Sequence, residues 1–405
     1  MRILFLTPDL PVPPDQGAKL RSLALIQAAA EHHEVHVLSF ESPHVPDGPL
    51  DASSLQAICK DVQLVPAPPP RSIVGRAFSM ILGTDPFPDL ARRLASAEFD
   101  EALGEKLAQT RFDVVQVEGL EMMGYHGAAR AANAATKVIY DAHNAETHLQ
   151  RTMAAAEARD PRRWHAAFYS LLQWSKLASY ERIMVNAADM VLAVSEEDAA
   201  KLRGRQAEPR VVPNGVDADA VAYQELSAEP RRTMVFMGPL DYRPNADAAR
   251  WLVRDVLPRI RKILPDARLR LVGRGSEHVH AEGVDSLGYV PDAAVELRRA
   301  DALIVPMRMG SGTRFKVLEA MAAGVPVVST PRGLAGISAE PGKHALVGRN
   351  PAELADAMAQ ALSDRTVARG IAASARSLVE QQYAWKRITP QYLKLLSEVR
   401  RTARP

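Results

Sequence analysis

The stretch Gly310-Ser-Gly-Thr-Arg-Phe-Lys-Val-Leu-Glu-Ala-Met-Ala-Ala-Gly-Val-Pro-Val-Val-Ser329 decides the fold. It follows the apolar run Ala302–Pro306, and the two together predict a strand, a glycine loop, a short helix and a second strand. The helix is expected from about Thr313 to Ala323, because apolar residues recur there at helical spacing, and Gly324 is expected to end it. The apolar run Val325–Ser329 is the next buried strand. Such a unit is typical of a parallel α/β sheet.

The loop of this unit has the composition of an anion-binding site. A glycine loop that leads into a helix presents free backbone N–H groups and the positive end of the helix dipole. Arg314 and Lys316 add two cations in the expected first turn, where the dipole disfavours each by roughly 0.3–1 kcal/mol. A bound anion would offset the unfavourable interaction of these two cations with the helix dipole. The loop residues expected to contact it are Gly310, Ser311, Gly312 and Thr313.

Glu319 extends this site by one helical turn. It lies three residues after Lys316, on the same helix face. Its carboxylate cannot help to bind a phosphate, but it can accept two hydrogen bonds from a ribose diol. The combination predicts a pocket for a nucleotide diphosphate. The alternative is a core helix with a solvated charged edge, which explains Val317, Leu318 and Met321 but not the glycines and the cations.

Length and composition set the protein class. The chain has 405 residues, of which 47% are hydrophobic and 24% charged, so two globular domains are expected. The single cysteine, Cys59, excludes an intrachain disulfide and a cysteine-cluster metal site. No apolar run approaches the ~20 residues that span a bilayer. We therefore expect a cytoplasmic enzyme, peripheral at most to the inner face of a membrane. Basic residues form no stripe interleaved with aromatic ones, so no nucleic-acid partner is expected.

Strands and helices alternate along both halves of the chain, which predicts two parallel sheets. The strand and Asn-Gly turn in Val211–Asp217 mark the expected boundary. We expect one Rossmann-like, doubly wound domain over residues 1–213, joined by a C-terminal helix at 385–405, and a second over 214–384. Two such domains facing each other across a cleft would bind ligands at the carboxyl ends of their strands.

The first half offers a second helix start that could approach a phosphate or sugar. Gly17 stands just ahead of an expected helix that carries Lys19 and Arg21. An ordinary loop with a solvated helix start explains these residues equally well, and both interpretations stay open.

Polar residues also follow two expected strands of the first half. Glu118 ends the run Phe112–Val117, and four polar residues come at or just after the end of the run Val138–Asp141. A rigid sheet edge positions such side chains well, which favours an active site over a structural histidine. The four residues are Asp141, His143, Asn144 and Glu146.

The chain resembles a known family of enzymes. Its second half is similar to the nucleotide-binding domain of family 4 glycosyltransferases, whose two-Rossmann architecture is called GT-B. Four stretches carry the resemblance: Val194-Ser195, Val212-Pro-Asn-Gly-Val-Asp217, Val235-Phe-Met-Gly238 and Gly312–Pro326. More loosely, the segments that end at Arg21 and at Glu146 resemble a bacterial branch of sugar transferases associated with exopolysaccharide assembly.

The resemblance implies transfer of a sugar from a nucleotide-diphosphate sugar to a glycan or lipid-linked acceptor, usually with retention at the anomeric carbon, without a metal and without a cofactor. Gly238 lies in the matched donor-binding segment. Arg314 and Lys316 are then expected to stabilise the leaving diphosphate, and His143 to contact the sugar or line the acceptor path.

Two positions depart from the commonest family pattern. Ser311 stands where the pattern has the first of two glutamates, and Pro239 stands where it has an arginine, followed by Arg243 farther along. These departures leave two alternatives open, a sugar-nucleotide epimerase of the same fold and a non-catalytic protein that binds sugar nucleotides.

The segment Pro161–Ile183 is rich in aromatic and leucine residues with a few cations among them. A packed helix is the favoured interpretation. The alternative is a basic amphipathic face that contacts a membrane and lets the enzyme reach a lipid-linked acceptor.

Overall fold

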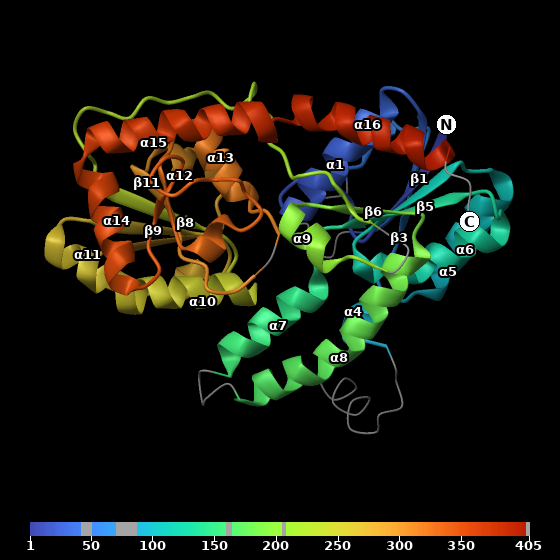
Figure 1. The fold of residues 1–405 in the computed structure, drawn as a ribbon, viewed down its shortest axis with the longest axis horizontal. Helices are drawn as coiled ribbons and strands as arrows, with labels where there is room; N and C mark the ends of the chain where they lie inside the picture. Colours follow the sequence, from blue (N-terminus) through green and yellow to red (C-terminus); the bar gives the residue numbers. More distant parts are fainter. Residues whose placement is uncertain (42–50, 70–86, 159–163, 205–207, 311, 402–405) are drawn as a thin grey trace. The chain divides into compact units, whose positions relative to one another are not determined.

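The computed structural model describes residues 1–41, 51–69, 87–158, 164–204, 208–310 and 312–401. The chain divides into two compact units, which are drawn in Figure 1. Unit 1 comprises Met1–Pro213 and Thr389–Pro405, and unit 2 comprises Asn214–Ile388. None of the helices in the described ranges combines the length and the hydropathy that a membrane-spanning segment needs.

Unit 1 is built on a seven-stranded parallel sheet with the order β3-β2-β1-β4-β5-β6-β7. The order runs outward in both directions from β1 and β4, which makes this pair the topological switch point of a doubly wound sheet. The central strands are buried on both faces, as expected where helices cover both sides. The strands are β1 Arg2–Thr7, β2 Glu34–Phe40, β3 Asp61–Val65, β4 Val114–Glu118, β5 Lys137–Ala142, β6 Met190–Ala193 and β7 Arg210–Val211.

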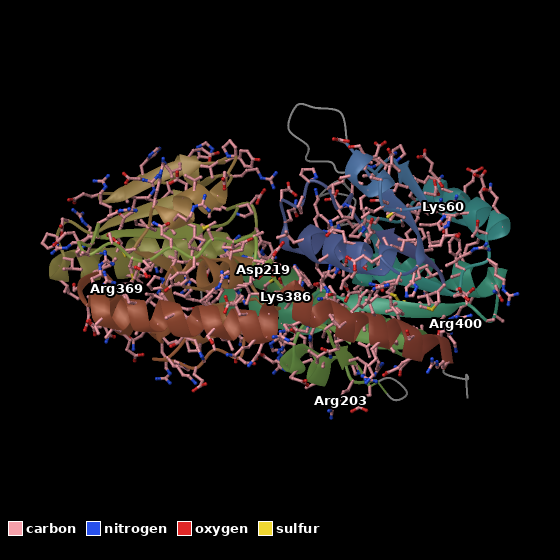
Figure 2. All side chains as sticks on the ribbon, turned by 90° about the horizontal axis from the view of Figure 1, so that it is seen from above. Lys60, Arg203, Asp219, Arg369, Lys386 and Arg400 are labelled. Carbon is pink, nitrogen blue, oxygen red and sulfur yellow. The ribbon has the colours of Figure 1, made fainter. Side chains whose placement is uncertain are left out.

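The helices of unit 1 follow these strands. They are α1 Gly17–Ala30, α2 Ser53–Gln56, α4 Asp89–Arg93, α5 Ala97–Gln109, η1 Leu120–Tyr125, α6 His126–Ala132, α7 Glu146–Glu157, α8 Trp164–Ala187 and α9 Glu196–Lys201. The last helix, α16 Trp385–Arg401, begins within unit 2 and continues into unit 1. Near its start, Lys386 forms an exposed salt bridge with Asp219 of unit 2, at 2.7 and 2.8 Å (Figure 2).

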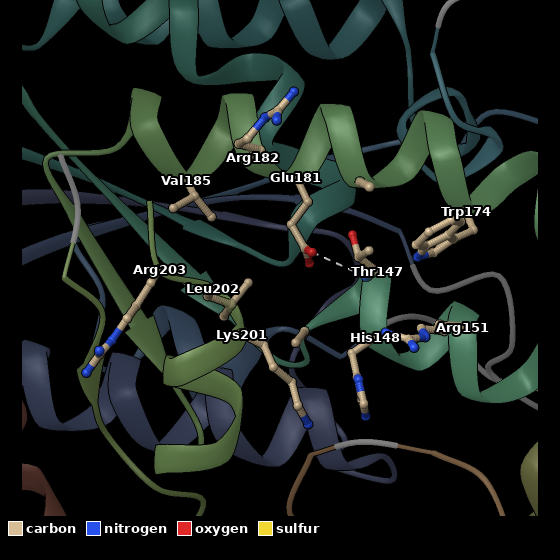
Figure 3. Close-up of a pocket in the computed structure, with 12 residues that line it drawn as sticks. Thr147, His148, Arg151, Trp174, Glu181, Arg182, Val185, Lys201, Leu202 and Arg203 are labelled. Carbon is tan, nitrogen blue, oxygen red and sulfur yellow. Dashed lines mark hydrogen bonds between the residues drawn. The ribbon is translucent and has the colours of Figure 1, made fainter. Parts of the chain in front are cut away.

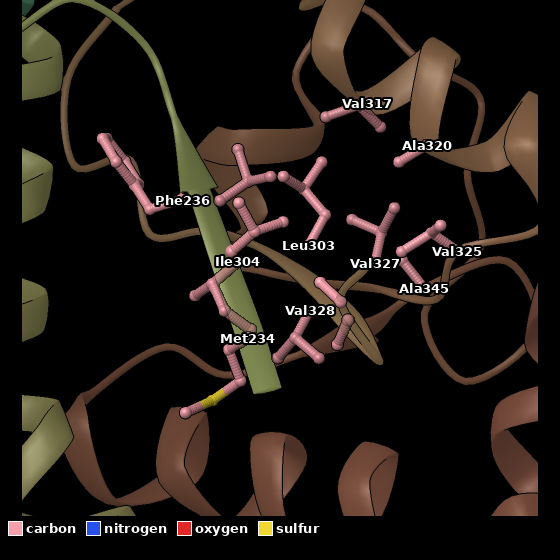
Figure 4. Packing of buried hydrophobic residues seen from close by; sticks show 14 of the residues in the cluster. Met234, Phe236, Leu303, Ile304, Val317, Ala320, Val325, Val327, Val328 and Ala345 are labelled. Carbon is pink, nitrogen blue, oxygen red and sulfur yellow. The ribbon is translucent and has the colours of Figure 1, made fainter. Parts of the chain in front are cut away.

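Unit 2 contains a six-stranded parallel sheet with the order β10-β9-β8-β11-β12-β13. Its core includes buried residues of β8, β11, β12 and α13, such as Phe236, Ile304, Val317 and Val328 (Figure 4). The strands are β8 Thr233–Met237, β9 Arg268–Val272, β10 Val284–Gly288, β11 Ala302–Val305, β12 Val327–Ser329 and β13 Leu346–Val347.

Two groups of helices cover this sheet. The helices α13 and α15 pack against each other on one side, and α10, α11 and α14 lie on the other (Figure 1). Their bounds are α10 Arg243–Trp251, η3 Leu252–Val256, α11 Leu257–Ile263, η4 Ser276–His278, α12 Ala293–Arg298, α13 Phe315–Ala323, η5 Pro331–Leu334, α14 Pro351–Ser363, α15 Arg365–Leu378 and η6 Val379–Tyr383.

The helix start in the opening stretch differs from the prediction. The helix α13 begins at Phe315 rather than at Thr313, and Arg314 is its extended N-cap residue. Thr313 is held before the helix by long-range contacts: its hydroxyl donates to Gly336 O at 3.2 Å, and its carbonyl accepts from Asn214 at 3.5 Å. Arg314 was expected within the first turn, but it precedes that turn. Lys316 is the second residue of the helix.

Candidate functional site

The first group of candidate residues lies at the carboxyl ends of neighbouring strands in unit 1. The strand β4 ends at Glu118, and β5 ends at Ala142, directly before His143. The helix α1, which follows β1, carries Arg21 and Ser22 to the same edge of the sheet. This is the edge and the switch point at which doubly wound sheets bind ligands.

A buried ion pair joins α1 to β5. Arg21 donates from Nε to Asp141 Oδ2 and from Nη2 to Oδ1, each at 2.7 Å, and from Nη1 to Val212 O at 2.8 Å. Burial favours the neutral form of Asp141, but the charge and hydrogen bonds of Arg21 outweigh it, and the pKa of Asp141 lies below its ordinary value. Arg21, predicted as a substrate contact, is 1% exposed and ties the strand ends together in this structure. Gly17 is the first residue of α1, rather than the residue before it.

Glu118 connects the ion pair to His143. Its Oε2 accepts from Ser22 Oγ at 2.7 Å and lies 3.1 Å from His143 Nε2, while its Oε1 accepts from Gln116 at 2.8 Å. Burial alone would lower the pKa of His143, but the hydrogen bond to Glu118 and the charge of Asp141 raise it overall. The protonated imidazole is thus stabilised relative to that of an exposed histidine. Its side chain is 15% exposed while both carboxylates are fully buried, so His143 is the member of this cluster that can reach a ligand.

Two further polar residues lie at the start of α7, where Asn144 precedes the helix and Glu146 is its first residue. Asn144 donates to Glu146 Oε1 at 3.1 Å, and Glu181 of α8 accepts from the backbone N–H of Glu146 at 2.7 Å. Burial and the negative charge of Glu121 raise the pKa of Glu146 to about 8. Glu146 is therefore mostly neutral at pH 7, and it can donate a hydrogen bond. The sequence marked Asn144 as a substrate contact, and that role stays a prediction.

The same cluster has the composition of a metal site. Ligand atoms of Glu118, Asp141 and His143 lie within 4.8 Å of one another. However, Arg21 uses both oxygens of Asp141, and Ser22 and Gln116 donate to Glu118. A guanidinium at this position supplies the charge that a divalent cation would otherwise supply, so the donor set fits a metal poorly.

The second group of candidate residues surrounds the start of α13 in unit 2. Arg314 donates to Gly312 O at 3.1 Å. Gly310 has a φ of +117°, and a Cβ there would lie 2.6 Å from Arg314 Nη2, so a glycine is needed to make room for the guanidinium. Ser311 lies outside the described residues.

Lys316 reaches from α13 to the end of β8. Its ammonium donates to Met237 O, lies 3.4 Å from Asn245 Oδ1 and stands 5.3 Å from the centre of the Phe236 ring. Burial, together with the positive charge of Arg314, lowers the pKa of Lys316 to about 7. Gly238 has a φ of +142°, and a Cβ there would lie 2.8 Å from Lys316 Nζ. The predicted Gly238 and Lys316 are therefore direct neighbours.

Glu319 lies one turn deeper on α13 and is half-buried. Burial raises the pKa of its carboxyl, while the charge of Lys316 acts in the opposite direction. Within the described ranges, no residue donates a hydrogen bond to this carboxylate. The arrangement places two cations and an uncommitted acceptor on one helix start, where they can hold an anion and a hydroxyl pair. Their binding roles stay predictions.

Sequence reasoning did not find a basic pocket of about 270 Å³ in unit 1, between α7, α8 and α9 (Figure 3). Its residues come from segments that lie up to 58 positions apart, from Ala145 to Arg203, so no local motif identifies them. The titratable residues at its wall are His148, Arg151, Glu181, Arg182, Lys201 and Arg203.

Two family models match the chain. Residues 17–220 match the model described as Glycosyltransferase Family 4, and residues 231–364 match the model described as Glycosyl transferases group 1. Between them they include the cluster of unit 1 and the α13 site of unit 2.

Curated relatives match over a shorter range. The phosphatidyl-myo-inositol mannosyltransferase of Mycobacterium leprae is 30% identical over 203 residues, 46% of this chain and 53% of that protein. Its namesake from Mycolicibacterium smegmatis is 32% identical over 205 residues, 46% of this chain and 51% of that protein. The chain thus spans about half the length of the curated relatives it matches.

Solved structures share the whole fold. The Anabaena protein Alr3699/HepE, in complex with UDP and glucose, matches with a TM-score of 0.66 at 16% identity, over 98% of this chain and 99% of that one. Sucrose-phosphate synthase from Thermosynechococcus elongatus matches with a TM-score of 0.71 at 18% identity, over the same shares. These likenesses confirm the predicted fold class, an α/β protein with two Rossmann-like domains of GT-B type.

Proposed function

Because the chain belongs to glycosyltransferase family 4, we propose that it transfers a sugar from a nucleotide-diphosphate sugar to a glycan or lipid-linked acceptor. The observation that carries this proposal is the start of α13, where Arg314, Lys316 and an uncommitted Glu319 share one helix end. A nucleotide sugar as donor is also supported by the Anabaena neighbour, which was crystallised with UDP and glucose. A lipid-linked acceptor, with peripheral membrane contact, is supported by the mannosyltransferase relatives, whose name specifies a phosphatidyl-inositol substrate.

The proposed chemistry needs charge stabilisation more than it needs a strong base. Cleavage of the sugar–phosphate bond leaves negative charge on the β-phosphate, and preorganised donors at that position lower the barrier. Arg314, Lys316 and the N–H groups at the start of α13 are the donors proposed for this role. The charge of Lys316 is incomplete in the free protein, and a bound diphosphate would complete it.

His143 is proposed to hydrogen-bond the transferred sugar or the acceptor. Its contact with Glu118 orients the imidazole, because a carboxylate at this distance accepts a hydrogen bond from a protonated Nε2. We propose transfer without a metal and without a cofactor, because the two basic side chains of the α13 site supply positive charge for the leaving group. Retention of the anomeric configuration is proposed from membership of the family alone.

Donor turnover tests the proposal. Purified protein is incubated with UDP-, GDP- and ADP-sugars in the presence of EDTA, and free nucleotide, altered sugar and transferred product are measured separately. Release of nucleotide together with a glycosylated acceptor is expected. A changed sugar without transfer would instead indicate an epimerase, and binding without turnover would indicate a non-catalytic protein.

Three alanine variants test the placement of the diphosphate. Arg314→Ala and Lys316→Ala should each lower the transfer rate ~10²–10³-fold, the usual effect of losing one preorganised donor. Arg243→Ala, at the first position of α10, is the control and should retain transfer. If Arg243→Ala alone abolished transfer, the phosphate site would not be at α13.

A further inference from the structure

One face of α8 is exposed along almost its whole length. Residues 164, 168, 171, 172, 175, 179, 182 and 183 fall on one side of the helix at spacings of three, four and seven, and all of them are exposed. Four large apolar residues in its first half form an apolar stripe: Trp164, Phe168, Leu171 and Leu172, with exposed fractions of 63%, 63%, 56% and 39%. Ile183, 58% exposed, continues the same face.

The opposite face of α8 accounts for its packing in unit 1. Leu177, Tyr180 and Met184 are buried in the core of that unit, and α7 runs beside α8 (Figure 1). The predicted packed helix is therefore correct for this face alone. The apolar stripe takes no part in that packing, and a large exposed apolar patch marks an interaction surface.

Cations flank the apolar stripe. Arg182 lies 18 residues, about five turns, after Trp164 and so on the same face. Arg151 of α7 and Arg203 after α9 lie at the edge of the basic pocket beside it. In the part of the chain that the structure describes, no carboxylate forms a salt bridge with any of these three arginines.

The pocket itself adds to the positive charge. Lys201 and His148 point the same way, whereas Arg182 extends in the opposite direction (Figure 3). Its one acid, Glu181, is buried and already accepts hydrogen bonds from the start of α7, and Lys201 pairs with Glu197 at 2.5 Å. The surface thus combines apolar bulk with an excess of cations.

We propose that this face of α8 docks on an anionic lipid surface. The apolar stripe enters the interfacial layer with the helix parallel to the membrane plane, and Arg151, Arg182 and Arg203 face lipid phosphates. A second copy of the chain is a poorer occupant, because a symmetric contact over the stripe brings like-charged arginines toward one another. The inference rests on the proposed function for its purpose, access to a lipid-linked acceptor, but docking itself requires neither donor nor transfer.

Vesicle binding tests the apolar stripe. The full chain is sedimented with vesicles of phosphatidylcholine, or of phosphatidylcholine mixed with phosphatidylglycerol, and the bound fraction is measured. Wild-type protein should bind the anionic vesicles, and the variant W164S/F168S/L171S should lose on the order of tenfold or more in affinity. The matched control is I263S/Y289S, which removes two exposed apolar residues of unit 2, 49% and 61% exposed, and should bind as wild type does.

Charge reversal tests the cations. R151E/R182E should lose binding to anionic vesicles, and added salt should weaken wild-type binding in the same way. Equal binding of wild type to neutral and anionic vesicles would overturn the proposal, as would unchanged binding of the stripe variant. A stripe variant that altered self-association in the ultracentrifuge without altering vesicle binding would assign the surface to a second copy.

Transfer to a soluble acceptor separates this inference from the proposed function. The stripe variant should retain turnover with a soluble acceptor, because its substitutions are exposed and lie at least ten residues before Glu181, where α8 contacts the start of α7. Vesicle binding without any turnover would support the docking surface and contradict the proposed function.

Discussion

Lys316 holds its ammonium against the carbonyl of Met237, in a position where burial and Arg314 both disfavour its charge. With a pKa of about 7, it is roughly half protonated in the free protein at neutral pH. A bound diphosphate favours the charged form and raises this pKa, so nucleotide binding should take up a proton above pH 7. Affinity for a nucleoside diphosphate should therefore fall as pH rises from about 7 toward 9, and change little below 7.

Calorimetric titration in two buffers of different ionisation enthalpy measures that proton uptake directly. Lys316→Met should bind more weakly at pH 6 and lose the pH dependence attributed to this group. A wild-type affinity that stayed flat across the same range would show that Lys316 does not face the phosphates.

Asp141 accepts two hydrogen bonds from the fully buried Arg21, and its loss should be costly. Asp141→Asn removes the carboxylate that pairs with this buried guanidinium, and breaking a buried pair typically costs about 3–5 kcal/mol of unfolding free energy. Asp285→Asn removes the partner of Arg268 on the surface, and the unfolding midpoint should hardly move. Denaturant unfolding compares the two, and equal small effects would mean that Arg21 finds other acceptors.

At the scale of elements, the loops after β8 and β9 meet backbone to backbone. Gly273 has a φ of +132°, and a Cβ there would stand 2.4 Å from Gly238 O. Gly273→Ala should therefore push the Gly238 loop away from Lys316, weaken nucleotide binding, and destabilise unit 2 by about 1–3 kcal/mol. Gly370→Ala is the control: it lies within α15 with nothing within 4 Å of its added Cβ, and it should stabilise by roughly 0.5–1 kcal/mol.

A Gly273→Ala protein that bound nucleotide as tightly as the wild type would show that this close approach is dispensable. Thermal unfolding and nucleotide titration of the two variants, measured together, separate the loop effect from the general effect of adding a methyl group.

Local elements were predictable where their signals were local. The periodicity of residues 315–323 and Gly324, with a φ of +78°, identified α13 and its end from sequence. The start was placed two residues early because Thr313 is held by Gly336 and Asn214, contacts that no local pattern reveals.

The site of unit 1 was predictable only in part, for the same reason. Strand ends marked Glu118 and His143, but Arg21 and Asp141 are 120 positions apart, so their pairing required the fold. For α8 the sequence predicted a helix but not which of its faces meets solvent, because aromatic residues occur on both.

At the scale of the whole molecule, α16 completes unit 1 from the far end of the sequence. Its Tyr392, Leu395, Leu396 and Val399 are at most 2% exposed, and Tyr392 donates to Gln116 at 2.7 Å. Burial of such side chains contributes roughly 1.5–3 kcal/mol each, which together rivals the 5–15 kcal/mol that stabilises a typical domain. A chain truncated after Ala384 should therefore lose protection from hydrogen exchange throughout unit 1.

The milder Tyr392→Phe should cost about 1–3 kcal/mol, because it leaves the buried Gln116 amide without its donor. Hydrogen exchange followed by mass spectrometry reads both units in one experiment. Full protection of β1, β4 and β5 in the truncated chain would show that unit 1 is complete without α16.

The path of α16 also has a consequence for how the protein is made. In connectivity, unit 2 is inserted into unit 1, so a ribosome releases all seven strands of the first sheet, and then the entire second sheet, before the residues that cover Gln116 emerge. The surface of the first sheet around Gln116 therefore stays exposed while unit 2 is synthesised. Unit 1 is therefore synthesised first but completes its folding last. A chaperone at the ribosome would have to bind unit 1 for longer than unit 2.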